Sequence, residues 1–293
     1  MEINNLKPDW LKKKIFFSDN NQFTRGLLKE NKVFTVCQEA RCPNQSECFH
    51  EKVATFLILG NICTRNCKFC SVESNNNEQT LKLDVDEAKR VAQAVDQMNL
   101  KYVVITSVTR DDLEDGGSGQ FVKTIKAIRN LNKLVKCEVL TPDFNGNYES
   151  IKRVVLENPE VYNHNLETIE RITPLLRSKS SYTRSLYVLE QVKKINAKIF
   201  TKSGIMLGLG ETKQEVLRLF QDLVNVGCDI ITIGQYLQAT KCNYPVQEYV
   251  SEDIFKFYKD EAIKLGFKLV FSSPFVRSSY NAYKSFESLK LTN

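Results

Sequence analysis

Three cysteines within eight residues, Cys63, Cys67 and Cys70, are the residues of this chain whose types and spacing most clearly suggest chemistry. They directly follow the apolar run 56–60. Three thiolates this close can bind three irons of a four-iron cluster and leave the fourth iron open to a ligand, whereas four thiolates normally restrict a cluster to electron transfer. A structural zinc site is the alternative. Zinc usually takes four side-chain ligands, however, and no fourth Cys or His lies within fifteen residues after Cys70.

A second cysteine triplet lies just upstream. Cys37, Cys42 and Cys48 are separated by four and then five residues, and both triplets fall within 34 residues. Two such sets imply two metal clusters. The remaining cysteines, Cys137, Cys228 and Cys242, are isolated, and we expect them to be small buried hydrophobic residues.

The spacing Cys-x-x-x-Cys-x-x-Cys resembles that of radical S-adenosylmethionine enzymes, and nearly the whole chain resembles the lipoyl synthase family. The stretches that carry this resemblance are 35–44, 47–48, 63–65, 69–72, 142–144, 163–168, 173–177, 202–212, 234–238 and 277–280. In the superfamily, the open iron chelates S-adenosylmethionine, and one electron cleaves it to a 5'-deoxyadenosyl radical. The resemblance therefore implies two 4Fe-4S clusters, with S-adenosylmethionine bound at the cluster of Cys63, Cys67 and Cys70.

The resemblance also implies the reaction. Radicals would abstract hydrogen from carbons 6 and 8 of an octanoyl chain linked to a lysine, and the auxiliary cluster held by Cys37, Cys42 and Cys48 would donate two sulfur atoms. An unactivated C–H bond offers no acidic proton to a general base, so a radical has to carry this step. In the family, a serine of the motif Arg-Ser-Ser-Tyr is the fourth ligand of the auxiliary cluster. Aligning this motif gives that role to Ser279. Oxygen matches cluster iron less well than sulfur does, so we expect that bond to be labile.

Four polar residues are candidates for holding S-adenosylmethionine. They are Ser107, Asn165, Glu167 and Arg177. The ammonium of the cofactor requires a carboxylate or carbonyl, and its carboxylate requires Arg or a hydroxyl. Each of these residues could instead be a helix cap or part of a surface ion pair. Of the two histidines, His50 and His164, the second is read as a structural imidazole.

The implied partners are proteins. The substrate would be an octanoylated lipoyl carrier protein, either the glycine cleavage H protein or the lipoyl domain of a 2-oxoacid dehydrogenase E2 subunit. An electron donor such as flavodoxin or ferredoxin and an iron–sulfur carrier for cluster renewal would also be needed. The rival hypotheses are another radical sulfurtransferase, such as a biotin-synthase-like enzyme, and a noncatalytic metal-binding or electron-carrier module.

Composition limits the remaining classes. The net charge of +6 is modest for 293 residues, and no basic recognition helix is present, so nucleic-acid binding is not expected. The run Lys12-Lys13-Lys14 is read as a solvated face. No signal segment opens the chain and no apolar run approaches about 18 residues, so we expect no membrane association. Clustered cysteines in an odd total of nine indicate a reducing, cytoplasmic location.

Alternating strand and helix patterns predict an α/β fold, an incomplete (β/α)6 TIM-like barrel. The predicted strands are 55–59, 102–106, 136–140, 161–165, 199–207 and 230–236. We expect residues 53–266 to form this barrel, with an N-terminal extension (1–52) and a C-terminal extension (267–293) that together hold the auxiliary cluster. The candidate site residues follow the strands, where loops of parallel barrels converge. Residues 1–30 are read either as an arm across the barrel or as a disordered start.

Two helix starts are predicted from capping patterns. Asp84 with Glu87, and Thr212 with Glu215, have the spacing of a capping box. The apolar positions of the first helix are expected to share a face; they are Val85, Ala88, Val91, Ala92, Val95 and Met98. The acidic stretch 111–117 is read as a flexible loop over the site.

Three places depart from the family pattern. Phe49 stands where tryptophan is usual, and Glu51 with Lys52 replaces small residues. The stretch 239–244 replaces one that normally begins with proline and contains histidine. None of these changes removes a predicted cluster ligand, and the third is expected to affect substrate contacts more than the reaction.

Overall fold

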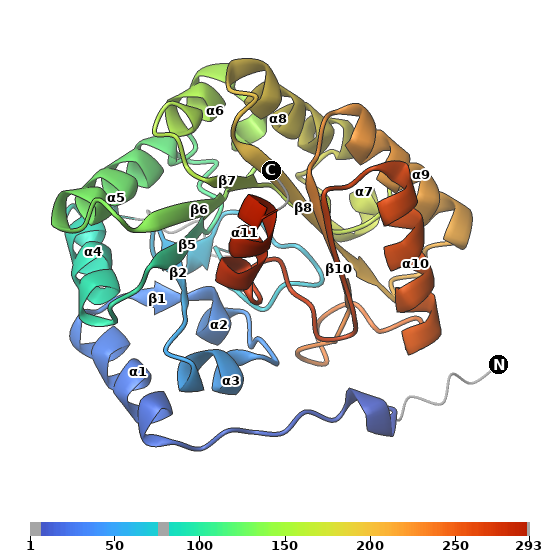
Figure 1. The fold of residues 1–293 in the computed structure, drawn as a ribbon, viewed down its shortest axis with the longest axis horizontal. Coiled ribbons are helices and arrows are strands. Elements are labelled where there is room, and N and C mark those ends of the chain that lie inside the picture. The colour runs from blue at the N-terminus through green and yellow to red at the C-terminus, as the bar shows by residue number, and fades with distance from the viewer. Residues whose placement is uncertain (1–6, 76–81, 292–293) are drawn as a thin grey trace.

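One curved sheet surrounded by helices forms the body of this protein (Figure 1). The computed structural model describes residues 7–75 and 82–291. The strands run in the order β1 (Phe34–Thr35), β2 (Thr55–Ile58), β5 (Tyr102–Ser107), β6 (Lys136–Leu140), β7 (Val161–Asn163), β8 (Phe200–Leu207), β9 (Ile230–Gln235) and β10 (Leu269–Ser272). All neighbouring pairs are parallel except β1 with β2. A separate short pair joins β3 (Ile62–Cys63) to β4 (Glu73–Ser74).

The predicted partial barrel is confirmed. All six predicted strands are present, as β2 and β5–β9, and six strand–helix units follow one another. The outer helices are α4 (Glu87–Gln97), α5 (Ser118–Leu131), α6 (Tyr148–Val155), α8 (Tyr182–Ile195), α9 (Lys213–Asn225) and α10 (Glu252–Leu265). The chain adds strands β1 and β10 at the two ends of the sheet. Sequence reasoning missed β1, which has only two residues, and β10, which lies beyond the last predicted unit.

Of the two helix starts predicted from capping patterns, one is correct and one is wrong. Thr212 and Glu215 form the predicted capping box before α9, with Thr212 N donating to Glu215 Oε2 at 2.8 Å. The box at Asp84 is wrong, because α4 begins at Glu87, and Val85 is 85% exposed. Glu87 is instead buried, and its carboxylate accepts hydrogen bonds from the backbone of the chain that leaves β2.

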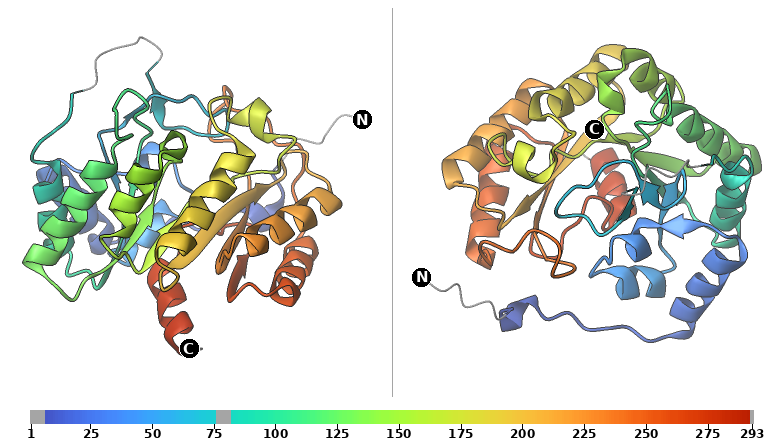
Figure 2. Two further views of the ribbon diagram at one scale, coloured as in Figure 1. Left: turned by 90° about the horizontal axis from the view of Figure 1, so that it is seen from above. Right: turned by 180° about the vertical axis from the view of Figure 1, so that it is seen from behind.

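The C-terminal helix α11 (Ala282–Leu291) lies at the end of the barrel opposite the loops that follow the strands (Figures 1 and 2). Its Phe286 packs against the Tyr102 ring, with the centroids 5.4 Å apart. The Tyr102 hydroxyl donates to Glu138 Oε2 at 2.7 Å, and Glu138 pairs with the buried Lys202 at 3.0 Å. These buried charges are mutually satisfied, as burial requires.

The first described residues form an arm rather than a disordered start. This N-terminal arm, residues 7–18, contains the short helix η1 (Asp9–Leu11) and crosses the open side of the barrel before α1 (Asp19–Glu30), as Figure 1 shows. Leu11 is fully buried. On the inner side of the arm lie two short helices, α2 (Val36–Glu39) and α3 (Gln45–His50). Within the described ranges no helix combines the length and the apolar character that a membrane crossing needs.

Glu87 shapes the turn that precedes the cysteine motif. Leu59 and Gly60 have φ values of +68° and +81°, and their amides donate to the Glu87 carboxylate at 2.9 and 3.0 Å. A third donor, Gln120 Nε2, lies at 2.8 Å. Consecutive amides in such turns form an anion-binding concavity, which the carboxylate fills.

Replacing Glu87 with alanine is expected to lower the free energy of unfolding by about 3 kcal/mol, because buried amide donors lose their acceptor. Urea unfolding measures this change. The matched control is Glu190→Ala, which removes a half-exposed carboxylate paired with Lys194 and should cost less than about 1 kcal/mol. Equal losses in the two variants would contradict the role given to Glu87.

Candidate functional site

The first cysteine triplet lies on a loop that follows β2 at the loop-bearing end of the barrel (Figure 2). We call residues 61–71 the cysteine loop. Its backbone is tied to three other parts of the chain: Thr64 N donates to Thr109 O at 3.0 Å, and Lys68 N donates to Leu176 O at 2.9 Å. Lys68 O in turn accepts from Tyr244 N at 2.8 Å. The loop is therefore held by elements that come together only in the folded barrel.

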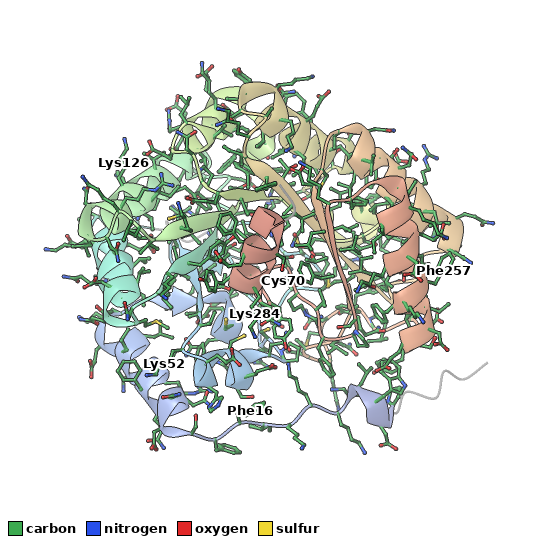
Figure 3. All side chains as sticks on the ribbon, viewed as in Figure 1. Phe16, Lys52, Cys70, Lys126, Phe257 and Lys284 are labelled. Carbon is green, nitrogen blue, oxygen red and sulfur yellow. The ribbon has the colours of Figure 1, made fainter. Side chains whose placement is uncertain are left out.

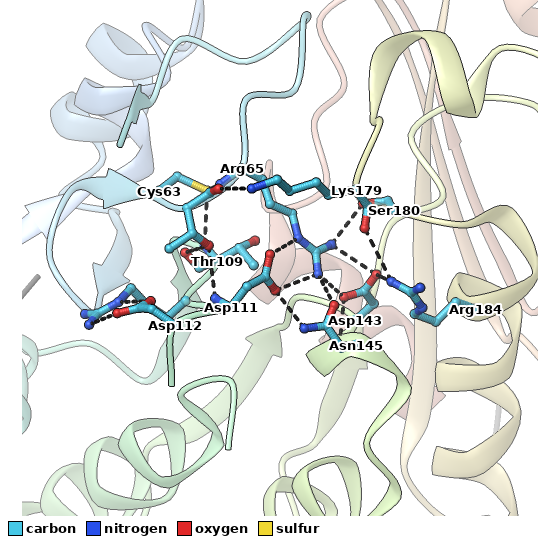
Figure 4. A network of polar contacts seen from close by, with 12 residues as sticks. Cys63, Arg65, Thr109, Asp111, Asp112, Asp143, Asn145, Lys179, Ser180 and Arg184 are labelled. Atoms are coloured by element: carbon cyan, nitrogen blue, oxygen red, sulfur yellow. Dashed lines mark hydrogen bonds and ion pairs between the residues drawn. The ribbon is translucent and has the colours of Figure 1, made fainter. Parts of the chain in front are cut away.

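Arg65, between the first two cysteines, anchors this loop (Figure 4). Its guanidinium makes paired hydrogen bonds to Asp111 at 2.7 and 2.8 Å and to Asp143 at 2.7 and 3.0 Å. It also donates to Asn145 Oδ1 and Ser180 Oγ. Bidentate arginine–carboxylate pairs combine strength with directional specificity. One side chain thus joins the cysteine loop to the loops after β5 and β6.

Burial and charge act against each other at Asp143. Burial raises the pKa of this carboxyl, but the hydrogen bonds and charge of Arg65 outweigh that effect and lower its pKa to about 2. Arg184 adds a second cation 3.3 Å from Asp143. The acidic stretch read as a flexible loop is similarly ion-paired, since Asp112 binds Arg110 and Asp115 binds Arg153. Its aspartates are therefore anchoring groups.

The three thiols of the cysteine loop influence one another. The pKa of Cys70 is raised to about 12, mainly by burial and also by the charges of Cys67 and Cys63, while a hydrogen bond from the backbone amide of Val72 opposes the rise. Cys63 Sγ accepts hydrogen bonds from the amides of Arg65 and Thr109, both at 3.4 Å. Amide donors of this kind suit a thiolate that binds metal.

The second triplet forms a similar set. Cys37 lies on α2, Cys42 follows that helix, and Cys48 lies on α3. Burial raises the pKa of Cys37 to about 12, with a further contribution from Cys42. Burial also raises the pKa of Cys48, and so do the charges of Cys37 and Cys42. Iron binding requires thiolates, so loading either set must release protons.

A cavity of about 480 Å³ joins the two cysteine sets. Its wall includes Cys70 from one set and Cys37, Cys42 and Cys48 from the other. In the view down the barrel, Cys70 falls near the centre of the ring of strands (Figure 3). The remaining wall is largely apolar; it includes Phe69, Leu140, Ile205, Met206, Tyr236 and Leu237.

The thiol geometry fits clusters better than single ions. All six cysteines are free thiols. Among the described residues, no group of three or more His, Cys, Asp or Glu side chains could hold one metal ion. In a four-iron cluster each thiolate binds a different iron, so the sulfur atoms need not converge on one point. A structural zinc site requires such convergence, and the arrangement therefore does not support it.

Two of the four candidate S-adenosylmethionine residues line the cavity. Asn165 Nδ2 donates to Glu167 Oε1 at 2.9 Å, and both side chains reach the wall. Glu167 has a φ of +66°, a strained value for a residue with a side chain, and such strain clusters at functional sites. Burial raises the pKa of Glu167, although the positive charge of Arg177 opposes this effect.

The other two candidates carry buried polar atoms without partners. Ser107 Oγ and Arg177 Nε make no hydrogen bond within the described part of the chain. Neither residue is part of the cavity wall. Arg177 Nη1 donates to the carbonyl oxygens of Asn165 and Leu166, at 3.4 and 3.0 Å. Because buried polar groups normally have partners, these two atoms fit a role in holding a polar ligand.

His164 is held neutral. Burial and the charge of Arg177 lower its pKa to about 4. Its Nδ1 donates to Thr141 O at 2.9 Å, and Nε2 has no partner among the described residues. A neutral, buried imidazole matches the structural reading of this residue at physiological pH.

The two serines of the C-terminal motif Arg-Ser-Ser-Tyr, residues 277–280, differ in their hydrogen bonds. Both serines line the cavity with the second triplet. Ser278 Oγ donates to Asn165 Oδ1 at 2.9 Å, whereas the Ser279 hydroxyl bonds to no other described residue. Glycines permit this close approach. A Cβ at Gly204 would lie 2.6 Å from Ser278 Oγ, and one at Gly234 would lie 2.1 Å from Val276 O. Sequence reasoning did not identify either glycine.

The structure also tests the predictions about the isolated cysteines and the divergent stretch 239–244. Cys137 and Cys228 are buried as expected, but Cys242 is exposed, so that prediction is wrong. It lies in the divergent stretch 239–244, which also contacts the cysteine loop: Asn243 Nδ2 donates to Cys70 O at 2.8 Å. This stretch therefore supports the loop in addition to placing Ala239 in the cavity wall.

The partial barrel and cysteine loop define the class of protein. The family model described as Radical SAM superfamily matches residues 57–223. Two solved structures share the fold at 12% identity. SuiB of Streptococcus suis bound to S-adenosylmethionine has a TM-score of 0.58 over 88% of this chain and 56% of its own. Methylornithine synthase has a TM-score of 0.53 over 94% of this chain and 89% of its own.

Curated relatives identify the family within that class. A lipoyl synthase of Caldicellulosiruptor saccharolyticus is 52% identical over 94% of this chain and 96% of its own length. A lipoyl synthase of Alkaliphilus metalliredigens is 48% identical over 96% of both chains. This chain belongs to the lipoyl synthase family of radical S-adenosylmethionine sulfurtransferases.

Replacing Arg65 with methionine is expected to lower the free energy of unfolding by about 3–5 kcal/mol, because it leaves Asp143 buried without its main partner. Urea unfolding under anaerobic conditions measures the change. Arg171→Met is the control, since Arg171 pairs with Glu215 at the surface with its own side chain 58% exposed. That exposed pair should contribute less than about 1 kcal/mol, and a similar loss in both variants would remove Arg65 as the anchor.

Proposed function

We propose that this enzyme inserts two sulfur atoms, at carbons 6 and 8, into an octanoyl chain carried on a lysine of a lipoyl carrier protein. One observation carries the proposal: a single, largely apolar cavity is bounded by Cys70 at one place and by the whole second cysteine triplet at another. Such a cavity can receive a hydrocarbon chain and present it to both sets. The near-complete match to lipoyl synthases supports the same reaction.

Cys63, Cys67 and Cys70 would hold the 4Fe-4S cluster to which S-adenosylmethionine binds. When bound and reduced, this pair supplies a carbon-centred radical able to take hydrogen from an unactivated C–H bond. Asn165 and Glu167 would bind polar groups of the cofactor from the cavity wall. Ser107 Oγ and Arg177 Nε, which lack partners among the described residues, would donate to its oxygen atoms.

Cys37, Cys42, Cys48 and Ser279 would hold an auxiliary 4Fe-4S cluster as the sulfur source. The free hydroxyl of Ser279 beside the three thiols supports this assignment. The apolar wall would hold the octanoyl chain and exclude water from the reacting carbons. Burial and the charge of Arg177 lower the pKa of His164 to about 4, so its neutral imidazole would not act as an acid in the hydrogen transfer.

This assignment requires three kinds of protein partner: a lipoyl carrier, an electron donor and an iron–sulfur carrier. The carrier would be the glycine cleavage H protein or a 2-oxoacid dehydrogenase E2 lipoyl domain. Flavodoxin or ferredoxin would supply electrons, and an iron–sulfur carrier would rebuild the auxiliary site after each turnover. We place the enzyme in the cytoplasm, where a reducing environment keeps clustered thiols available as metal ligands.

Alanine substitutions in the two cysteine triplets should affect different steps, radical formation for the first triplet and sulfur insertion for the second. With an octanoylated lysine peptide, dithionite and S-adenosylmethionine, the native enzyme should form lipoyl-lysine and 5'-deoxyadenosine, detected by mass spectrometry. Cys63→Ala, Cys67→Ala or Cys70→Ala should abolish both products. Cys37→Ala, Cys42→Ala or Cys48→Ala should still form 5'-deoxyadenosine but no lipoyl-lysine. Cys137→Ala, buried in β6 away from the cavity wall, is the control and should retain both.

The proposal fails if the native enzyme leaves the octanoyl peptide unchanged. The division of labour fails if folded variants of both triplets lose 5'-deoxyadenosine formation equally.

Ser279 should behave as a replaceable ligand. Ser279→Cys is expected to raise iron retention during chelator challenge and to lower lipoyl-lysine formation at least tenfold, because thiolate binds iron more tightly than oxygen does. Ser279→Ala should lose iron faster than the native enzyme. Ser273→Ala, an exposed serine before the same segment, is the control. Native iron retention and turnover in both Ser279 variants would exclude this residue and leave Ser278 as the candidate.

A further inference from the structure

Lys13 differs from the lysines beside it. Lys12 is exposed and pairs with Asp9, and Lys14 is exposed. The Lys13 side chain is only 18% exposed. The run of three lysines is therefore not a uniform solvated face. Its middle member points from the N-terminal arm toward the protein.

On one side, the Lys13 ammonium contacts the segment that carries the second cysteine triplet. It pairs with Glu47 Oε2 at 2.6 Å and donates to Asn44 Oδ1. Asn44 lies two residues after Cys42, and Glu47 directly precedes Cys48. A charge-assisted hydrogen bond in a partly buried place is stronger than an exposed ion pair.

On the other side, the same ammonium faces two aromatic rings of the C-terminal segment. It lies 5.2 Å from the Phe275 ring centroid and 5.1 Å from that of Tyr280. Both distances fall within the range of cation–π attraction. One cation thus contacts two segments that are more than 200 residues apart in the sequence.

Direct contacts close the junction between these two segments. The Tyr280 hydroxyl donates to Glu47 Oε1 at 2.8 Å, and Asn44 Nδ2 donates to Phe275 O at 2.7 Å. Lys13 therefore binds the same carboxylate as Tyr280 and the same amide group as Phe275. Removing its ammonium would leave Glu47 with one fewer partner and both rings without their cation.

Residues 275–280 form neither helix nor strand. Their position therefore depends on side-chain contacts and a few turn hydrogen bonds, such as Tyr280 N to Arg277 O at 2.9 Å. Ser279 lies between the two aromatic residues that Lys13 contacts. On the barrel side, Ser278 holds the same segment through Asn165.

We propose that Lys13 is a positioning residue that clamps residues 275–280 onto the segment carrying Cys42 and Cys48, and so fixes Ser279 at the cavity. The part concerning Ser279 rests on the proposed function. The clamp itself is a property of the folded chain. The N-terminal arm thereby contributes to the auxiliary site without supplying a ligand.

Hydrogen–deuterium exchange of the anaerobically reconstituted enzyme tests the clamp. Lys13→Met should make the backbone amides of 275–280 exchange at least about fivefold faster, because local opening becomes easier. Lys14→Met removes the same charge one residue away and should leave these amides unchanged. Lys13→Arg should restore protection, because a guanidinium can bind a carboxylate and stack on aromatic rings. Peptides from β5 and β6 should exchange equally in all variants.

Product ratios provide a second readout. Lys13→Met should keep the native rate of 5'-deoxyadenosine formation but yield severalfold less lipoyl-lysine for each 5'-deoxyadenosine released. A loss of global stability would lower both products together. If Lys13→Met does not fold, Tyr280→Phe, which removes only the hydroxyl bonded to Glu47, should give the same local increase in exchange.

Equal exchange of 275–280 in Lys13→Met and Lys14→Met would overturn the clamp, whatever the activity of the native enzyme. Failure of the native enzyme to form lipoyl-lysine would overturn the proposed function and leave the exchange result to decide the clamp. Faster exchange with an unchanged product ratio would overturn the link from the clamp to Ser279.

Discussion

The paired hydrogen bonds of Arg65 to Asp111 and Asp143 are the interaction on which the cysteine loop depends. The cysteine loop contains little regular structure, so its shape depends on contacts with other parts of the chain. The buried guanidinium fixes the loop to the ends of β5 and β6. Burying this charge is tolerable only because two carboxylates satisfy it. The position of the three thiols is thus set by the barrel itself.

The second cysteine triplet depends on a different constraint, the contact of the N-terminal arm with residues 275–280 on the open side of the barrel. The N-terminal arm, α3 with its N-cap residue, and residues 275–280 contact one another through Lys13, Asn44 and Glu47. Strands β8 and β9 admit the C-terminal segment because Gly204 and Gly234 lack side chains. A single cavity bounded by Cys70 and by the whole second triplet results from this arrangement.

Much of the fold could be predicted from sequence, since six strands and the α9 capping box follow local patterns. The errors have physical reasons. Glu87 has the spacing of a capping residue, but tertiary burial uses its carboxylate to hold the turn at Leu59 and Gly60. Cys242 was expected to be buried because isolated cysteines usually are, yet it lies on an exposed loop. Lys13 could not be told from Lys12 and Lys14, because only distant residues distinguish them.

The sequence by itself predicted iron–sulfur cluster chemistry. The cysteine spacing and the stretches that resemble the family are short and local, and the ligand properties of each residue type do not depend on the fold. It could name Ser279 as a candidate ligand, but it could not show which serine hydroxyl is already engaged. Only the tertiary structure decided that both serines line the cavity and that the Ser278 hydroxyl is already bonded to Asn165. The same holds for the partners of Arg65 and Lys13. Such contacts join residues 31 to more than 200 positions apart, and local sequence patterns carry no information about which distant groups the fold brings together.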